Sequence, residues 1–291
     1  MSSFNKKALV IGINLYKNPK ISDLRCCAND ARSVKNMLEM EEYGFQTQLK
    51  IDQKAGRRSI KEGLNWLFDK ETDFALLYFA GHGLVDDIGT YIVTYDGDEI
   101  DFGIELSKID LYLRKKLRNG TNAVIVLDCC HAGGMPLKRG ESEFTRSIAS
   151  EDIRSEIGQM RSGHAVLAAC GPDQQATELP SLDHGIFTHH FLEALYGGAA
   201  NESGVITVNL IHNYISSKFK DNDYPKPVFK ASIAGGIELA EGMQPRLTNQ
   251  IPDDTKKELE QKAVQLINDH NKLHNVDIET WKLKNQKRAS E

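Results

Sequence analysis

Long apolar runs are missing from the sequence. Nowhere do 18 or more apolar residues follow one another, so we expect no transmembrane helix and no contact with a membrane. The N-terminal segment has two lysines and then only the short apolar run 8–13, whereas a signal peptide needs a longer run and a small-residue cleavage site. We therefore expect a cytoplasmic protein.

Cysteine is scarce, and its placement argues against a disulfide framework. The chain has five cysteines, which are Cys26, Cys27, Cys129, Cys130 and Cys170. An odd number with two adjacent pairs is a poor basis for disulfides, and adjacent cysteines lack the CxxC spacing with which two sulfurs face one zinc ion. We expect reduced thiols, no bound metal and no cofactor.

A surplus of positive charge is also absent. The formal net charge is -5, whereas a dedicated nucleic-acid-binding protein usually carries a basic face, so no nucleic-acid partner is predicted. The sequence shows no internal repeat and no low-complexity tract. With 40% hydrophobic and 26% charged residues over 291 positions, the chain can bury a sizeable globular core.

Short apolar segments alternate with helical patterns along the chain. The predicted strands are residues 8–13, 46–51, 74–80, 91–94, 123–127 and 165–169, and the predicted helices are 29–40, 59–68, 106–117, 187–195 and 208–219. Continuously apolar runs such as FALLYFA are typical of strands buried on both faces of a parallel sheet. The alternation predicts an α/β fold with helices on both faces of a mostly parallel sheet.

Two parts of the chain differ from this alternation. Residues 133–160 are poor in large apolar side chains and predict a long surface loop, of the kind that is often functional or mobile. Beyond Pro252, apolar residues recur at helical spacing. We predict a main domain over residues 1–245, with a linker loop at 135–160, and a C-terminal helical extension at 246–291.

The chemistry-bearing residues follow two of the predicted buried strands. The first segment, YFAGHG, contains His82, and the second, VLDCCHAGG, contains Cys130. Ligand sites of parallel sheets lie outside the carboxyl ends of the strands, so the two side chains are expected to meet as a thiol nucleophile and its base. Gly81 and Gly83 are expected to let the backbone turn sharply there, with the amides of Gly83 and Cys130 facing a substrate oxyanion.

Four segments, in order, resemble the caspase-like cysteine peptidases of clan CD (family C14), especially the metacaspase-type and bacterial branch. They are KALVIGINLY with LRCCANDARSVKNML, then FAGHG, then LDCCHAGG, then HAVLAACGPDQQATE with HGIFTHHFLEAL. His82 and Cys130 are 48 positions apart, close to the spacing of about 50 found in caspases. The resemblance implies a three-layer αβα sandwich with about six central strands. It divides the main domain into a large-subunit-like part, 1–134, and a small-subunit-like part, 161–245.

The resemblance also assigns roles. It implies that Cys130 is the nucleophile, His82 the catalytic histidine and Gly83 the oxyanion-hole glycine. Asp30 and Asp128 align with the carboxylates that line a pocket for basic side chains, since paired carboxylates favour guanidinium or ammonium groups. The prediction is an endopeptidase that cleaves protein or peptide substrates after Arg or Lys through an acyl-enzyme. The family's habits imply a regulated protease in bacterial defence or stress.

The sequence departs from the metacaspase pattern in several places. Ala80 and Cys129 replace serines that often stand in the two motifs. Where calcium-binding metacaspases show an acidic pair, residues 104–108 read IELSK, and position 137 is a leucine. Calcium dependence is therefore not supported by the sequence. A different oxygen site, or simply a solvated loop, is open to Asp86, Asp87, Asp96 and Asp98.

Several residues have a second interpretation. Asp30 can be a charge favoured at a helix N-terminus, with Asn29 as the N-cap. The other cysteines and His131 are interpreted as structural. Lys138, Arg139 and Arg146 in the loop are candidate self-cleavage sites of a basic-specific protease, or solvated residues. The C-terminal extension either binds an activating protein partner or packs on the core.

Two rival functions stay open. An inactive caspase-like scaffold would bind partners without hydrolysis, although intact His82 and Cys130 argue against it. A caspase-like protease with a preference for acidic residues is the other rival, because Arg25 lies near the proposed pocket in the sequence.

Overall fold

The computed structural model describes residues 4–85, 89–98, 100–117, 121–131, 164–169, 184–220, 227–232 and 236–243. The chain forms two units, residues 1–246 and residues 247–291. The predicted C-terminal helical extension and linker loop, with Lys138, Arg139 and Arg146, lie outside the described residues. All of the described helices and strands belong to the first unit.

The described residues form one eight-stranded sheet at the centre of this unit. Its main row runs β2–β1–β3–β6–β7–β9, and β4 and β5 continue from the end of β3. The bounds are β1 Lys6–Gly12, β2 Gln46–Ile51, β3 Phe74–Val85, β4 Thr90–Val93, β5 Gly103–Glu105, β6 Asn122–His131, β7 His164–Ala168 and β9 Val228–Ser232. The first five strands of the row are parallel, and β9 is antiparallel to β7. The predicted mostly parallel sheet is confirmed.

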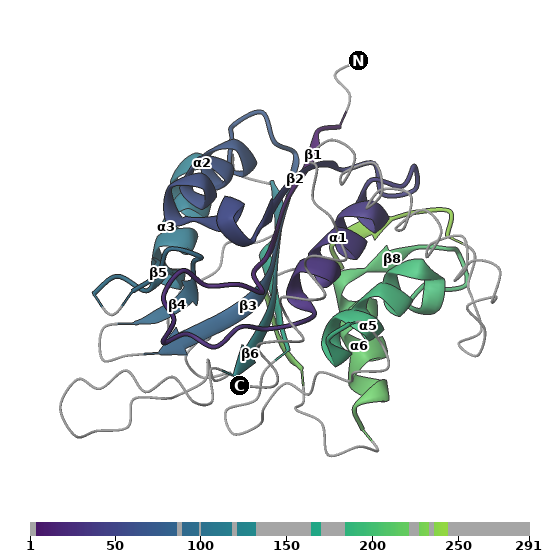
Figure 1. Cartoon of the computed structure of the whole chain (residues 1–291). Helices are drawn as coiled ribbons and strands as arrows, with labels where there is room; N and C mark the ends of the chain where they lie inside the picture. Colours follow the sequence, from purple (N-terminus) through teal and green to yellow (C-terminus); the bar gives the residue numbers. More distant parts are fainter. Residues whose placement is uncertain are drawn as a thin grey trace, which may run out of the picture. The chain divides into compact units, whose positions relative to one another are not determined.

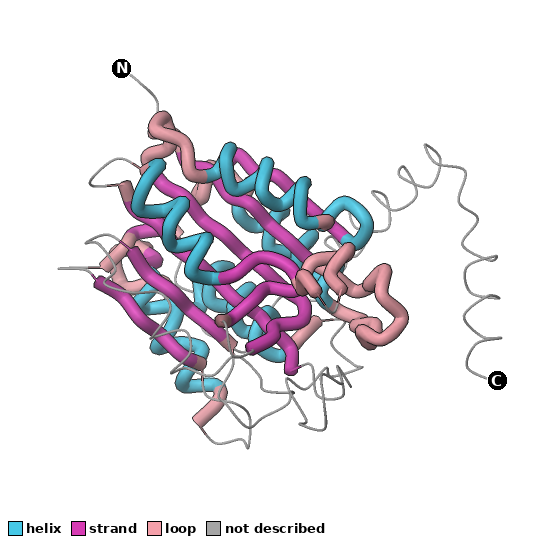
Figure 2. The backbone as a smooth tube through the Cα atoms, turned by 90° about the vertical axis from the view of Figure 1, so that its left-hand side faces the viewer, coloured by secondary structure: helices cyan, strands magenta, loops and turns pink. Residues whose placement is uncertain are grey.

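Helices cover both faces of this sheet (Figure 1). One face carries α2 (Arg57–Leu67) and α3 (Leu106–Lys116), and the other carries α1 (Cys27–Leu38), α5 (Ile186–Glu193) and α6 (Val208–Lys218). Figure 2, seen from the side of α2 and α3, shows the strands side by side behind these helices. A small pair of strands, β8 (Ile206–Thr207) and β10 (Glu238–Ala240), is separate from the main sheet. The αβα sandwich predicted from the sequence is confirmed.

Strand β1 shows why the apolar runs are continuous rather than alternating. Leu9 and Ile11 pack into the core under α2 and α3, whereas Ala8 and Val10 pack into the core under α1, α5 and α6. All four side chains have no solvent exposure. Because successive residues of a strand point to opposite faces, a strand with a core on each side needs apolar residues at every position.

Gly12 ends β1 and brings α1 close to the sheet. A Cβ atom there would stand 2.2 Å from the carbonyl oxygen of Cys27 and 2.6 Å from the Cβ of Ala31. Only glycine therefore allows the first turn of α1, which carries Asp30, to lie against the end of the strand.

The sharp turn predicted at Gly81 and Gly83 is wrong. Strand β3 runs through both glycines to Val85, because β4 pairs with its last three residues and β6 pairs alongside as far as Gly83. Gly81 is needed for packing instead. A Cβ there would stand 2.8 Å from the ring of Phe79 and 3.1 Å from the Tyr16 hydroxyl.

The predicted N-cap of α1 is also wrong. The helix begins at Cys27, with Cys26 in the N-cap position and no capping hydrogen bond from its side chain. The side chain of Asn14, in the loop after β1, accepts a hydrogen bond from the amide of Ala28 at 3.0 Å. A distant residue therefore satisfies a donor of the first turn that a local cap would otherwise serve.

Candidate active site

The backbone brings the two predicted catalytic positions side by side. In the parallel pairing of β3 with β6, His82 is opposite Cys130, Ala80 is opposite Asp128, and Gly83 is opposite His131. Neighbouring strands of a sheet stand about 4.8 Å apart. The side chains of Cys130 and His131 are outside the described part of the structure, so the pairing of thiol and imidazole stays a prediction that the register supports.

The imidazole of His82 is held in one orientation by main-chain and tyrosine contacts. Its Nε2 lies 2.8 Å from the carbonyl oxygen of Ser22, and its ring lies beside that of Tyr16, with 5.0 Å between centroids. A carbonyl oxygen only accepts, so Nε2 is the nitrogen that carries the hydrogen. In a neutral imidazole this makes Nδ1 the basic nitrogen. The residue is 1% exposed, so the orientation is fixed by packing as well.

The loop at residues 13–26 supplies these contacts and is itself fixed. The hydroxyl of Tyr16 accepts a hydrogen bond from the His82 amide at 2.8 Å. Asp52, at the end of β2, accepts hydrogen bonds through Oδ1 from the amides of Asn14 and Leu15 at 2.7 and 3.0 Å. The loop therefore connects three neighbouring strands of the sheet at the end where His82 lies.

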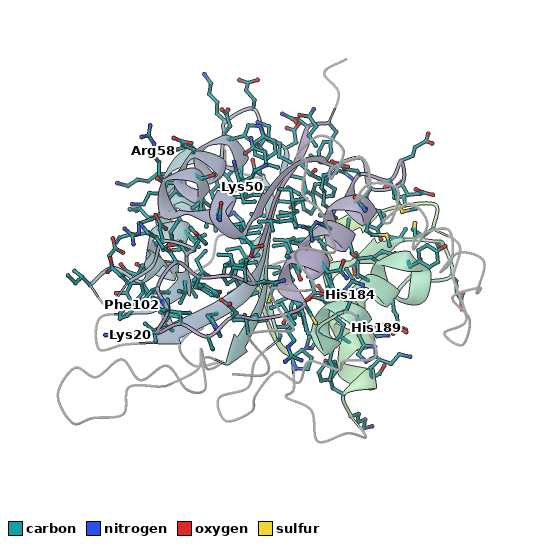
Figure 3. All side chains as sticks on the ribbon, viewed as in Figure 1. Lys20, Lys50, Arg58, Phe102, His184 and His189 are labelled. Atoms are coloured by element: carbon teal, nitrogen blue, oxygen red, sulfur yellow. The ribbon has the colours of Figure 1, made fainter. Side chains whose placement is uncertain are left out.

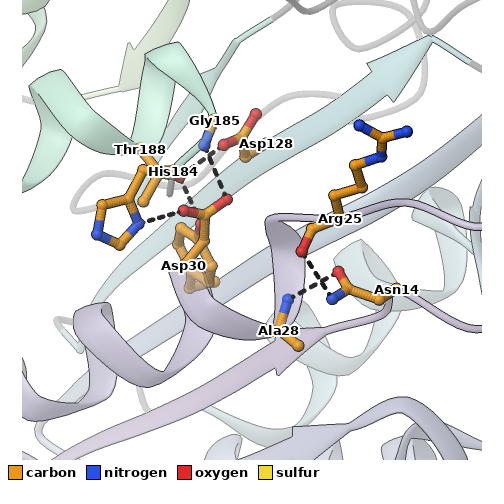
Figure 4. A network of polar contacts seen from close by, with 9 residues as sticks. Asn14, Arg25, Ala28, Asp30, Asp128, His184, Gly185 and Thr188 are labelled. Atoms are coloured by element: carbon orange, nitrogen blue, oxygen red, sulfur yellow. Dashed lines mark hydrogen bonds and ion pairs between the residues drawn. The ribbon is translucent and has the colours of Figure 1, made fainter. Parts of the chain in front are cut away.

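The structure brings the two predicted pocket carboxylates together. Asp30 in α1 and Asp128 in β6 are 1% and 3% exposed. A Cβ placed on Gly185 would stand 3.3 Å from the Oδ2 atoms of both carboxylates. Figure 4 shows the two side chains converging from different elements below the start of α5. Glycine at this position keeps the space between the carboxylates clear of a side chain.

A set of hydrogen bonds holds the acid pair, which is Asp30 with Asp128. The Oδ1 of Asp30 lies 2.6 Å from His184 Nδ1, and its Oδ2 accepts from the Gly185 amide at 3.3 Å. The Thr188 hydroxyl donates to Asp128 Oδ2 at 2.5 Å and lies 2.5 Å from the Tyr78 hydroxyl. Since Thr188 has one hydrogen to give, Tyr78 donates to Thr188 in this arrangement.

Burial and proximity alter the protonation of the acid pair. The pKa of Asp128 is raised to about 7, first because the carboxyl is buried and second because of the charge of Asp30. The hydrogen bonds from Thr188 act in the opposite direction. The same burial, with the two nearby carboxylates, raises the pKa of Tyr78 well above its ordinary value. The site thus favours a bound cation that would offset the negative charge.

Several of these partners were not predicted from the sequence. His184, Gly185 and Thr188 lie in the HGIFTHHFLEAL segment, which carries the family resemblance, but the resemblance assigns them no role. In Figure 3 His184 lies beside α1, on the sheet face that α1, α5 and α6 cover. Nothing in the sequence marks Ser22 or Tyr16, because their contacts depend on the path of a loop.

The other described cysteines and Arg25 lie apart from the acid pair or within the core. The side chains of Cys26, Cys27 and Cys129 are buried. In Figure 4 the side chain of Arg25 extends away from the acid pair, while its carbonyl oxygen accepts a hydrogen bond from Asn14. This position gives no support to the rival with acidic specificity.

Asp96 and Asp98, two of the candidate ligands for an oxygen site, stabilise the loop between β4 and β5 through hydrogen bonds. Asp96 accepts hydrogen bonds from the Arg57 amide at 2.7 Å and the Thr94 hydroxyl at 2.8 Å. Asp98 accepts from two amides of its own turn, which lower its pKa. Neither belongs to a group of three metal-ligating side chains among the described residues, and the neighbouring Asp86 and Asp87 are outside them.

Comparison with known proteins gives the class to which this fold and site belong. A family model for the caspase domain of peptidase family C14 matches residues 5–257. The chain therefore belongs to the caspase-domain family, as the four sequence segments indicated. Where the structure describes the chain, none of the helices combines the length and the apolar character needed to cross a bilayer.

Several similar proteins are metacaspases. The chain is 29% identical to Metacaspase-1 of Eremothecium gossypii over 158 residues, covering 44% of this chain and 32% of the relative. It is 28% identical to Metacaspase-4 of Arabidopsis thaliana over 181 residues, covering 54% and 41%. It is 31% identical to Metacaspase III c of Phaeodactylum tricornutum over 180 residues, covering 53% and 52%. The chain thus spans about a third to a half of the length of these relatives.

A solved structure shares the fold. The crystal structure of protein GSU0716 from Geobacter sulfurreducens superposes with a TM-score of 0.58 at 17% identity. The likeness covers 79% of this chain and 94% of that one. At this identity the comparison supports the architecture alone.

Proposed function

We propose that the protein is a cysteine endopeptidase in which Cys130 is the nucleophile and His82 is its base. The observation that carries the proposal is the backbone register, which makes the two residues direct neighbours on parallel strands. The caspase-domain match supports a cysteine-peptidase activity on protein substrates. The contact from His82 Nε2 to the Ser22 carbonyl adds that Nδ1 is the basic nitrogen of the neutral ring.

The proposed reaction needs no group beyond the chain and water. His82 Nδ1 takes the proton of the Cys130 thiol, and the sulfur attacks the peptide carbonyl carbon. The imidazolium then gives its proton to the departing amine, which leaves an acyl-enzyme. Water, deprotonated by His82, releases the acid and restores the thiol.

The amides of Gly83 and Cys130 are the proposed donors to the oxyanion. Gly83 lies one residue past His82 and is paired with His131 on β6, so both amides belong to the strand ends that carry the dyad. A donor of this kind typically contributes about 3 kcal/mol to the transition state.

Asp30 and Asp128 support a preference for Arg or Lys before the cleaved bond. Two buried carboxylates that face the same glycine favour a planar guanidinium or an ammonium group, because each can accept charge-assisted hydrogen bonds. An acidic side chain would add a third negative charge to the site. The raised pKa of Asp128 shows that charge is already costly there.

A reporter panel tests this function. Peptides that differ only in the residue before the cleaved bond, namely Arg, Lys, Asp and Ala, are compared for kcat/KM, with and without calcium. We expect turnover of the Arg and Lys peptides and none with Cys130→Ala. The matched control is Cys129→Ala, which removes the neighbouring buried thiol and should retain activity.

Each rival function has its own outcome in the same panel. Faster cleavage of the Asp peptide would contradict the role of the acid pair. An absence of turnover with folded protein, and with any activating partner supplied, would favour the inactive scaffold. A calcium requirement would contradict the expectation that no metal is needed.

The regulatory predictions belong to parts of the chain outside the described residues. We propose self-cleavage after Lys138, Arg139 or Arg146, an activating protein partner bound through residues 246–291, and a role in bacterial defence or stress. Intact-protein mass spectrometry with time tests the first of these. Fragments ending at the three sites should form in the active protein and not in Cys130→Ala.

A further inference from the structure

The C-terminal part of α5 carries a compact group of metal-ligating side chains. His189, His190 and Glu193 each offer one ligand atom, and these atoms lie within 4.8 Å of one another. Among the residues that the structure describes, these three form the one group of this kind. It is separate from His82, Asp30 and Asp128, and the proposed protease mechanism does not use it.

The three side chains already converge on one point. The Oε2 of Glu193 lies 2.8 Å from Nδ1 of His190, and its Oε1 lies 3.5 Å from Nε2 of His189. The two imidazole rings are edge to face, with centroids 5.1 Å apart, so the rings do not block each other. The three side chains are 19% to 24% exposed, which leaves room for an ion to enter from solvent.

The donor set indicates the kind of metal. Two imidazole nitrogens and one carboxylate oxygen make up the His₂Glu set that binds zinc while leaving a coordination position open. Imidazole suits Zn²⁺, Cu²⁺ and Ni²⁺, whereas Mg²⁺ and Ca²⁺ prefer sets made of oxygen atoms.

Neighbouring residues on α6 and after it hold two of the three ligands. The Tyr214 hydroxyl donates to Glu193 Oε2 at 3.3 Å. The ring of Phe219 stands edge to face with His190, with 5.6 Å between centroids. Outer contacts of this kind orient metal ligands and raise metal affinity.

From this arrangement we propose that His189, His190 and Glu193 form a binding site for one zinc-like divalent cation. In the metal-free protein His190 lies at hydrogen-bond distance from the carboxylate, 2.8 Å, and His189 lies 3.5 Å from it. On binding, the ion takes the place of the hydrogen between a ring nitrogen and the carboxylate. A neutral imidazole moves that hydrogen to its other ring nitrogen, and an imidazolium releases it to solvent. The site lies on the helix whose Thr188 contacts Asp128, but the proposal does not depend on proteolysis.

The test measures zinc binding in a background without the candidate nucleophile. Cys130→Ala protein is titrated with Zn²⁺ by calorimetry, with Co²⁺ absorption as a spectroscopic check of the ligand set. We expect one strong zinc equivalent whose affinity falls at least tenfold with His189→Ala, His190→Ala or Glu193→Gln. Ca²⁺ and Mg²⁺ should not compete for it.

The control removes a histidine that lies elsewhere on the same face. His212 is on α6, stacks on Phe229 and is outside the three-residue group. His212→Gln should leave the zinc equivalent unchanged. Thermal unfolding without metal checks that each variant is folded. Glu193→Gln is the most informative variant, because it keeps the shape of the side chain and removes only its charge. Equal zinc affinity in the parent and in folded Glu193→Gln and His189→Ala would overturn the proposal.

Discussion

The surroundings of His82 and those of the acid pair differ in charge, although both lie at the same end of the sheet. His82 is held by uncharged groups, the Ser22 carbonyl and the Tyr16 hydroxyl and ring. Asp30 and Asp128 are held by short hydrogen bonds, and burial, followed by the charge of Asp30, raises the pKa of Asp128 to about 7. The contacts of His82 orient its imidazole for proton transfer, whereas the acid pair places negative charge where a cation can bind.

The largest expected effect comes from the first region. In His82→Gln the new amide can still donate to the Ser22 carbonyl, but it has no basic nitrogen. We expect kcat to fall by about 10²- to 10⁴-fold on every peptide that the protein cleaves. The thermal midpoint should change little. If the loss depended on the residue before the cleaved bond, His82 would be acting on specificity instead of proton transfer.

A smaller and selective loss is expected from the second region. Asp30→Asn keeps the side-chain size and removes the charge that faces the bound cation. A hydrogen bond to a charged group contributes about 1.5–3 kcal/mol, so kcat/KM for Arg and Lys peptides should fall roughly 10- to 100-fold. The Ala peptide should be unaffected or improve. An equal loss of kcat/KM on all peptides would show that Asp30 does not take part in substrate recognition.

The comparison also shows how far the sequence predicts the site. The sheet, the five helices and the His82–Cys130 neighbourhood follow from apolar runs and two motifs, because parallel strands end at one edge. The Ser22 and Tyr16 contacts depend on how a loop folds over the sheet, and periodicity says nothing about that. The acid pair was predicted from the resemblance. Its link to His184 and Thr188 joins residues 60 to 154 positions apart, beyond the reach of local patterns.

Element ends were less predictable than element positions. Strand β3 extends to Val85 because β4 returns and pairs with it, a tertiary contact that its Gly-rich end did not indicate. Helix α1 begins two residues before the expected Asn29, because Asn14 reaches across to cap it. In both cases a distant partner supplies hydrogen bonds that the local sequence does not.

The raised pKa of Asp128 predicts how the stability of the folded protein depends on pH. A raised carboxyl pKa means that the native state keeps a proton that the unfolded state has lost between about pH 4 and pH 7. This contribution to stability is present at low pH and is lost as the pH rises through that window. Asp128→Asn should therefore be more stable than the parent by about 1–3 kcal/mol at pH 8, with little difference at about pH 3, below the unfolded pKa.

Denaturant unfolding at the two pH values measures this effect. Asp98→Asn is a matched control with the opposite sign, because hydrogen bonds from its own turn lower the pKa of Asp98. Its substitution should destabilise the protein, and more at pH 8 than at low pH. A parent protein that gains stability relative to Asp128→Asn as the pH rises would contradict the repulsion between Asp30 and Asp128.

The smallest effect is expected at His184, which shares Oδ1 of Asp30 with any incoming cation. Removing the competing hydrogen bond in His184→Ala should raise kcat/KM for Arg peptides about three- to tenfold, mainly through KM. The Ala peptide is the internal reference. A loss of activity on Arg peptides would show that His184 orients Asp30 and does not compete with the substrate.

Covalent labelling tests whether Cys130 is the nucleophile and His82 its base. A peptide chloromethyl ketone ending in Arg is incubated with the protein, and the modified residue is located by peptide mapping. We expect one adduct per chain, on Cys130. Its formation should be slowed at least tenfold in His82→Gln, and at least as strongly when Asp replaces Arg in the probe. Labelling that falls on Cys129 or Cys170, or that proceeds equally fast in His82→Gln, would contradict this expectation.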